Sequence, residues 1–198
     1  MRKVLTILFV FVSILAFTGC SGGEEHTYVV SKETCIWLFN SEPIDMEINA
    51  DTSPWVGDNY VSMEEDEDGN LVIVLNDKHV EHWRKEILGK FENAKKADER
   101  DGIGKSFELS EDYTEFVYYS NEELSDGTVI KIGLLFPYCG ILQMLDGVDP
   151  NEWYVDIKVI DVDTGITVKE GRLPDDKKFG VKKEDWEKAI GKSDAGLS

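Results

Sequence analysis

Basic residues are scarce in this sequence: 21 Lys and Arg stand against 40 Asp and Glu, which gives a formal net charge of −19. Binding of nucleic acids or of anionic lipid head groups depends on Lys and Arg that neutralise phosphate, so we expect neither as a partner. The acidity is explained by the need to keep a domain soluble, and cationic ligands are the electrostatically compatible class.

Motifs for catalysis are also lacking. No convincing Gly-x-Ser-x-Gly motif is found, and the sequence contains no Ser-x-x-Lys or His-Glu-x-x-His pattern and no glycine-rich loop for phosphate. Its three histidines leave few ways to form a Ser-His or Cys-His pair. Carboxylates are so numerous that no pair can be singled out for glycoside hydrolysis. We therefore expect a domain that binds rather than catalyses, with no cofactor.

Long hydrophobic runs are missing apart from one near the start. Val4–Phe17 is apolar or small throughout, follows two basic residues and precedes Thr18-Gly19-Cys20. This run is shorter than the roughly 20 residues that a membrane-spanning helix needs. The arrangement resembles the leader of a bacterial lipoprotein, with Phe17 at the position where that family usually carries Leu.

The resemblance implies that residues 1–19 are removed as a signal peptide and that the Cys20 thiol is diacylated. The lipid would anchor the protein to the extracytoplasmic side of a cell membrane. An ordinary secretory leader cut near Gly19 and an uncleaved membrane anchor are the alternatives. The rest of the chain is expected to form a flexible tether over 20–27, a single globular domain over 28–192 and a frayed tail over 193–198.

Only three cysteines are present. If Cys20 carries the lipid, Cys35 and Cys139 remain, and an exported compartment permits a disulfide between them. Closing that loop would stabilise the fold by roughly 4 to 5 kcal/mol in the chain-entropy model. Both residues have apolar neighbours in the sequence, so two separate buried thiols are the alternative.

The pattern of apolar residues predicts an α+β fold, in which an antiparallel sheet built from hairpins is packed by one long amphipathic helix and one or two shorter ones. The long helix begins at Asn76 or Asp77 and runs to about Lys96, with a helix also expected from Pro137 to Leu145 and a short one over Lys182–Ile190. Expected strands are Cys35–Phe39, Ile44–Ile48, Tyr60–Met63, Leu71–Leu75, Phe107–Leu109, Thr114–Tyr119, Thr128–Phe136, Trp153–Asp161 and Ile166–Glu170.

A second, loose resemblance concerns the part after Cys20. The strand-to-helix unit Leu71–Lys96, together with Asp146–Pro150 before a hairpin whose turn is Asp163-Thr164-Gly165, is similar to small, uncharacterised lipoproteins of Gram-positive bacteria. This resemblance implies no activity.

His79, His82 and Glu86 form a candidate metal site. Their spacing places all three on one side of the predicted helix, away from its apolar stripe. A solvated helix face explains the same residues, and no further ligand is evident. The acidic run 64–70 resembles an EF-hand loop only in its first half, because Leu75 stands where that loop needs Glu.

Trp55 lies between Pro54 and Val56 in a turn-rich segment and is the tryptophan most suited to exposure on a binding surface. We interpret the chain as a membrane-anchored, non-enzymatic module that binds a protein, peptide or glycan at the cell envelope. The alternative is an envelope hydrolase that uses carboxylates or a metal near His79 and His82.

Overall fold

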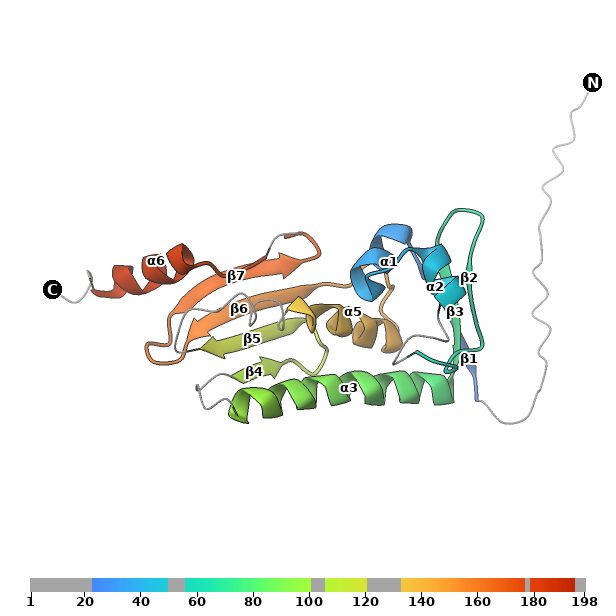
Figure 1. Cartoon of the computed structure of the whole chain (residues 1–198), viewed down its shortest axis with the longest axis horizontal. Helices are drawn as coiled ribbons and strands as arrows, with labels where there is room; N and C mark the ends of the chain where they lie inside the picture. Colours follow the sequence, from blue (N-terminus) through green and yellow to red (C-terminus); the bar gives the residue numbers. More distant parts are fainter. Residues whose placement is uncertain (1–22, 50–55, 101–105, 121–132, 177–178, 195–198) are drawn as a thin grey trace, which may run out of the picture.

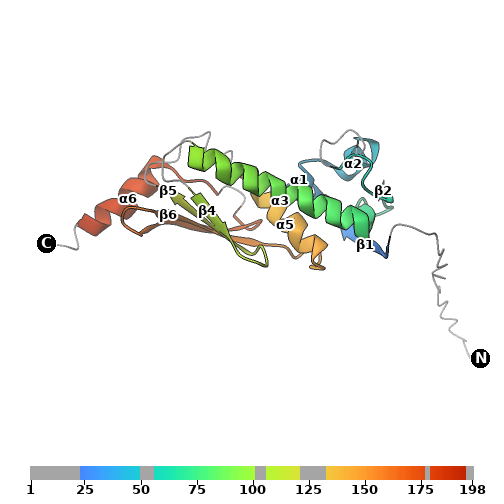
Figure 2. The ribbon, with the colours of Figure 1, turned by 90° about the horizontal axis from the view of Figure 1, so that it is seen from below.

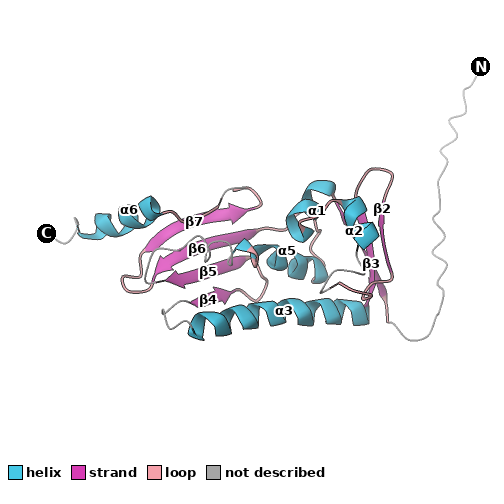
Figure 3. Ribbon diagram, viewed as in Figure 1, coloured by secondary structure: helices cyan, strands magenta, loops and turns pink. Residues whose placement is uncertain are grey.

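The computed structural model describes residues 23–49, 56–100, 106–120, 133–176 and 179–194. They form an α+β fold, which confirms the predicted class. Two separate sheets lie on either side of a group of helices (Figure 1, Figure 3). The sequence predicts one sheet, and the division into two is the main difference at the level of architecture.

The first sheet has three antiparallel strands in the order β1-β3-β2. They are β1 (Glu25–Val30), β2 (Ser62–Glu65) and β3 (Leu71–Asn76). The hairpin of β2 and β3 is as predicted. Every second residue of β3 is buried, which is the alternation that marks a strand with one face on the core.

The second sheet has the order β4-β5-β6-β7. Its strands are β4 (Ser106–Leu109), β5 (Glu115–Ser120), β6 (Val155–Asp161) and β7 (Thr167–Leu173). The outer pairs are antiparallel, as predicted, but β5 and β6 are parallel. Parallel neighbours need a long crossover connection, and helix α5 (Phe136–Leu145) lies within it.

Helix α3 (Asp77–Arg100) joins the two sheets. Its 24 residues span about 36 Å at 1.5 Å per residue. It packs on β3, α5 and β4, so it runs from one sheet to the other (Figure 2). The predicted apolar stripe is confirmed, because Trp83, Ile87 and Phe91 are buried. At the far end of the second sheet, α6 (Lys183–Asp194) packs on β7.

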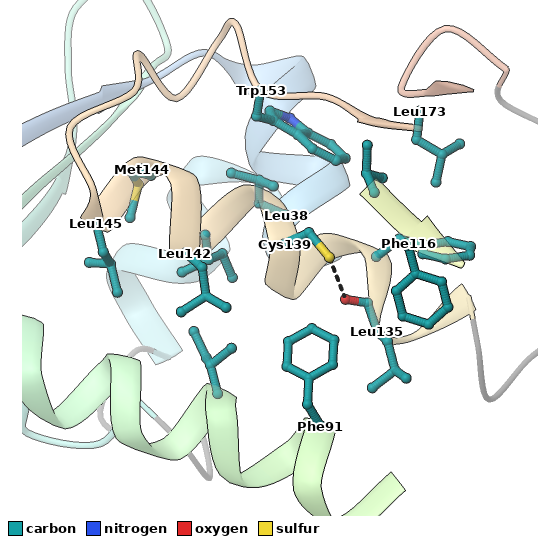
Figure 4. Close-up of a cluster of buried hydrophobic side chains, with 14 of the residues drawn as sticks. Leu38, Phe91, Phe116, Leu135, Cys139, Leu142, Met144, Leu145, Trp153 and Leu173 are labelled. Atoms are coloured by element: carbon teal, nitrogen blue, oxygen red, sulfur yellow. Dashed lines mark hydrogen bonds between the residues drawn. The ribbon is translucent and has the colours of Figure 1, made fainter. Parts of the chain in front are cut away.

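Helix α5 is the centre of the core. Eight of its ten residues are buried, and Pro137 stands in its first turn, as predicted. The Cys139 thiol lies among apolar side chains that include Leu38 and Trp153 (Figure 4). The strand expected over Thr128–Phe136 is absent from residues 133–136, which are helical or in a turn. Residues 128–132 lie outside the described part of the chain.

Two short helices replace two predicted strands. The first, α1 (Lys32–Phe39), covers the segment Cys35–Phe39 that the sequence predicts as a strand. Ser31 caps it: the Ser31 hydroxyl oxygen accepts a hydrogen bond from the Thr34 N–H at 3.3 Å. A side-chain cap of this kind fixes a helix start that a short apolar run alone does not reveal.

The second short helix is α2 (Pro43–Asn49), where the sequence predicts a strand over Ile44–Ile48. A strand would place Ile44, Met46 and Ile48 on one face. In the helix only Met46 of the three is buried, and the two isoleucines are 44% and 65% exposed. The alternation was therefore misleading, and Pro43 at the helix start is the informative residue.

The predicted tether over residues 20–27 is shorter than expected, because β1 already begins at Glu25. Glu24 is held as well: its N–H donates to the Asp77 carboxylate at 3.0 Å, and its carbonyl accepts from the Asp77 N–H at 3.1 Å. These bonds fix the chain to the start of α3 immediately before the strand.

Candidate functional site

Strand β1 is an edge strand whose outer side faces a groove. Its partner β3 lies on one side only. In an antiparallel pair the backbone groups of alternate residues point to opposite sides. The Glu24 carbonyl points towards the β3 side, where it meets Asp77, so the backbone groups of Glu25, Thr27 and Val29 point outward.

The opposite wall of this groove is the loop between α5 and β6. The cavity between them has a volume of about 580 Å³ and is lined by two stretches, His26–Val29 of β1 and Leu145–Pro150 of the loop. We call it the β1 groove. Val29 and Val148 are 46% and 39% exposed, so each wall offers apolar surface as well as backbone.

Asn151 closes one end of the β1 groove. Its side-chain Oδ1 accepts from the Ser31 N–H at 2.8 Å, and its Nδ2 donates to the Val29 carbonyl at 3.0 Å. The amide thus occupies the place that a neighbouring strand would take. Asp149 holds Asn151 in position by accepting from its backbone N–H at 2.8 Å. Edge strands of β-sheets are often covered by a side chain or loop in this way. Here Asn151 covers only the end of β1.

Tyr28 and Asp146 belong to the lining of the groove, and Asp146 forms an ion pair with Arg84. Arg84 of α3 donates through Nη2 to Asp146 at 2.6 Å and to the Leu145 carbonyl at 3.2 Å. Burial raises the pKa of Tyr28, Arg84 opposes that rise, and Asp146 adds to it. Tyr28 is therefore neutral at physiological pH, and the charge of Arg84 is balanced by Asp146.

A second cavity continues the groove beyond Asn151. It has a volume of about 390 Å³ and is lined by Ser31, Glu33, Thr34, Trp37, Asn151, Trp153, Pro174 and Asp175. The two cavities are adjacent because their lining passes from Val29 to Ser31 on one wall and from Pro150 to Asn151 on the other. We call the second one the Trp37 cavity.

Two tryptophans shape the Trp37 cavity. The rings of Trp37 and Trp153 meet edge to face, with centroids 6.4 Å apart and planes at 65°. Trp153 is buried, whereas Trp37 is half-buried and retains an accessible surface. Glu33 lies one helical turn before Trp37 on α1, which brings a carboxylate to the same side of the helix.

One residue of the predicted metal site, His79, caps helix α3. The Asn76 side chain accepts from the His79 N–H at 3.1 Å, and His79 Nδ1 lies 3.5 Å from the Asn76 backbone nitrogen. This reciprocal arrangement caps α3 as a capping box does. Burial, together with the neighbouring charges of His82 and Lys78, lowers the pKa of His79, which suits a neutral acceptor.

No group of three or more His, Cys, Asp and Glu side chains in the described part of the chain is arranged to hold a metal ion. His82 and Glu86 belong to α3, but the metal site that they would form with His79 stays a prediction. In the acidic β2–β3 turn, Asp66 accepts from the backbone N–H groups of Asp68 and Asn70 at 2.9 and 2.8 Å. The Asp66 carboxylate therefore stabilises the turn.

The predicted cysteine pair is not joined in the structure. Cys35 of α1 and Cys139 of α5 are both free and buried. Burial raises the pKa of Cys35 to about 12 and raises that of Cys139 further, so both thiols are protonated and unreactive. Cys20 and Trp55 lie outside the described residues.

No protein-family model, curated protein or solved structure matches the chain. Over the residues described, none of the helices combines the length and the apolar character that crossing a bilayer requires.

Sequence reasoning missed the groove. It singled out Trp55 and gave no role to Trp37 or to Asn151, which bonds to residues about 120 positions earlier in the chain. The run Asp149-Pro150-Asn151 is a turn signal, but nothing in it identifies β1 as the strand that it meets.

Proposed function

We propose that the chain is a lipid-anchored, extracytoplasmic binding module that takes an extended peptide segment of a partner protein onto the outer edge of β1. The observation that carries this proposal is the edge itself: the backbone N–H and carbonyl of Thr27 and the backbone N–H of Val29 are on the outer side of β1, next to a groove of about 580 Å³. Strand addition uses such main-chain donors and acceptors for affinity and the neighbouring pockets for specificity.

Charge supports a basic peptide. Asp149 lines the loop wall, Asp146 beside it is balanced by Arg84, and the protein as a whole is strongly acidic. Such a field attracts cationic segments and repels acidic ones. The exposed Val29 and Val148 supply apolar surface for the side chains between the basic positions.

Thr27 provides the test of strand addition. Thr27→Pro removes the outward N–H and leaves the β1–β3 bonds intact, since proline is tolerated on the free side of an edge strand. Heptapeptides selected from a random display library against the full chain in detergent should lose at least tenfold in affinity for this variant. The matched control Thr27→Val keeps the N–H and the branched side chain, and we expect it to bind like wild type.

Two outcomes would contradict the proposed edge. One is equal peptide affinity of the Thr27→Pro and Thr27→Val variants, and the other is failure of the library to enrich any sequence. Circular dichroism of the proline variant shows whether a loss of affinity is local or comes from unfolding.

Cys20 provides the test of the anchor. A bacterial host expressing the wild-type chain should incorporate an alkyne-labelled palmitate into the protein, and Cys20→Ala should abolish the label because the acceptor thiol is gone. Cys35→Ala is the control and should stay labelled, since that thiol is buried. Label that persists without Cys20 would remove the basis for the anchor.

A further inference from the structure

The outer edge of β1 is open over a short stretch and closed at its end. Over the residues that the structure describes, the Thr27 N–H, the Thr27 carbonyl and the Val29 N–H have no hydrogen-bond partner. The next two outward groups are the Val29 carbonyl and the Ser31 N–H, and the Asn151 amide binds them at 3.0 and 2.8 Å. A strand added at this edge therefore has three backbone groups to pair with before it meets Asn151.

Hydrogen bonds hold the Asn151 side chain in this place. Its Nδ2 donates both to the Val29 carbonyl and to the Asp149 carboxylate, the latter at 3.1 Å, so both of its amide hydrogens are used. The same carboxylate accepts from the Asn151 backbone N–H at 2.8 Å. A ligand that displaced the side chain would break its bonds to Ser31, Val29 and Asp149 together, so Asn151 is a fixed obstacle at the end of the open edge.

An antiparallel strand conflicts with this obstacle. In an antiparallel pair, one residue of the added strand would exchange both hydrogen bonds with Thr27, and the next hydrogen-bonded residue would lie opposite Val29. The carbonyl of that residue would accept from the Val29 N–H. Its own N–H, however, would have to lie at the Val29 carbonyl, where Asn151 Nδ2 already stands. The fitting group and the colliding group belong to one residue, so the strand cannot turn away between them.

A parallel strand avoids the conflict. In a parallel pair, one residue of the added strand donates to the Thr27 carbonyl and accepts from the Val29 N–H, and the residue two positions earlier accepts from the Thr27 N–H. All three open groups of β1 are then paired. The next nitrogen that would approach the Val29 carbonyl belongs to the residue two positions later. A whole residue is therefore available in which the chain can turn away from Asn151 towards the adjacent Trp37 cavity.

We propose that Asn151 determines the direction of the bound peptide, which runs parallel to β1 with its carboxyl-terminal end towards Asn151. This inference rests on the proposed function, because it concerns the peptide bound in the same groove. A parallel strand passes Asn151 without placing a chain end there. The ligand is therefore an internal segment of the partner protein, and it needs no free amino terminus.

Nitroxide labels on the peptide test its direction. A heptapeptide enriched from the display library is synthesised with an acetylated amino end, an amidated carboxyl end and a nitroxide at one end or the other. It is added to the full ¹⁵N-labelled chain in detergent. We expect the carboxyl-terminal nitroxide to broaden the Asn151 amide resonances more than that of His26, and the amino-terminal nitroxide to do the reverse, because a nitroxide broadens the nuclei nearest to it.

Two results would overturn the proposed direction. One is the opposite broadening pattern, and the other is loss of binding on acetylation, which would place a free amino end at Asn151. Both differ from failure of the proposed function, in which no peptide is enriched or Thr27→Pro binds as well as Thr27→Val.

Variants assign the direction to Asn151. A peptide of reversed sequence presents the same order of side chains only when it runs antiparallel, so the wild-type chain should bind it at least tenfold more weakly than the selected peptide. Asn151→Ala should reduce this preference at least threefold, because the Val29 carbonyl becomes open. Asn70→Ala removes an asparagine that bonds to Asp66 in the β2–β3 turn, and it should keep the full preference. An unchanged preference in Asn151→Ala would show that another feature sets the direction.

Discussion

Tyr118 of β5 carries a buried hydroxyl that finds no hydrogen-bond partner among the described residues. Burial raises the pKa of this tyrosine, and the nearby Asp98 adds to the rise. A buried polar group without a partner costs about 1 to 3 kcal/mol relative to water. Tyr118 as a whole is only 1% exposed, so its ring is well packed. The hydroxyl is the one part of the side chain whose burial is unfavourable.

Replacing Tyr118 with phenylalanine should therefore leave the free energy of unfolding unchanged or raise it by about 1 kcal/mol. Urea unfolding followed by circular dichroism measures the change. Tyr119→Phe is the matched control on the opposite face, where the exposed hydroxyl donates to Glu108 at 3.1 Å and its loss should have little effect. A Tyr118→Phe variant that is clearly less stable than wild type would mean that the hydroxyl has a partner in solution.

At the scale of elements, two helical glycines occupy opposite environments. A methyl group at Gly89 of α3 would meet nothing within 4 Å. At Gly140 of α5 it would lie 2.6 Å from a Leu38 methyl carbon and 2.7 Å from the Trp153 ring. Gly140 is therefore the residue that lets α5 approach α1 and Trp153 so closely.

The same substitution should have opposite effects at these two sites. Gly89→Ala should stabilise the protein by about 0.5 to 1 kcal/mol, because alanine is the better helix former. Gly140→Ala should destabilise it by about 1 to 3 kcal/mol through overpacking. Urea midpoints of both variants measure the difference, and two changes of the same sign would contradict the packing described around Gly140.

The elements show which patterns in a sequence are informative. The stripe from Val80 to Ala94 repeats over several turns, and α3 formed where that pattern predicts it. Helices α1 and α2 are too short for a repeat of apolar residues to develop. The informative residues are instead the N-cap Ser31 of α1 and Pro43, which begins α2. The parallel pairing of β5 with β6 depends on the crossover through α5, which local alternation does not encode.

The candidate site was harder to predict than the fold. Its walls come from β1, α1 and the α5–β6 loop, and their meeting is a product of tertiary packing. The sequence analysis selected acidic and aromatic groups as candidates, and that selection stays a prediction. It selected Trp55, however, and not Trp37, because a half-buried tryptophan in an apolar run looks the same as a core residue.

At the scale of the whole molecule, α3 and α5 make the two sheets interdependent. Helix α3 packs on β3 of the first sheet and on β4 of the second, and α5 packs on α1, α3 and β6. Neither sheet can lose its helices without exposing the apolar surface of the other. The two sheets therefore belong to one core.

We expect a single unfolding transition as a consequence. Far-ultraviolet circular dichroism, which reports on secondary structure, and tryptophan fluorescence should give the same urea midpoint, as a two-state domain requires. Removing the apolar contact of α3 with Phe107 by Phe91→Ala should lower both midpoints together. Midpoints that separate would show that the sheets unfold as independent units.

The pairing of Glu24 with Asp77 has a consequence for how the molecule would meet its partners. With a lipid on Cys20, only three residues would lie between the anchor and this fixed point, a reach of about 15 Å at most. The β1 groove would then stay next to the bilayer surface. Its search for ligands would be two-dimensional, and segments of other membrane proteins would meet it far more often than freely diffusing peptides.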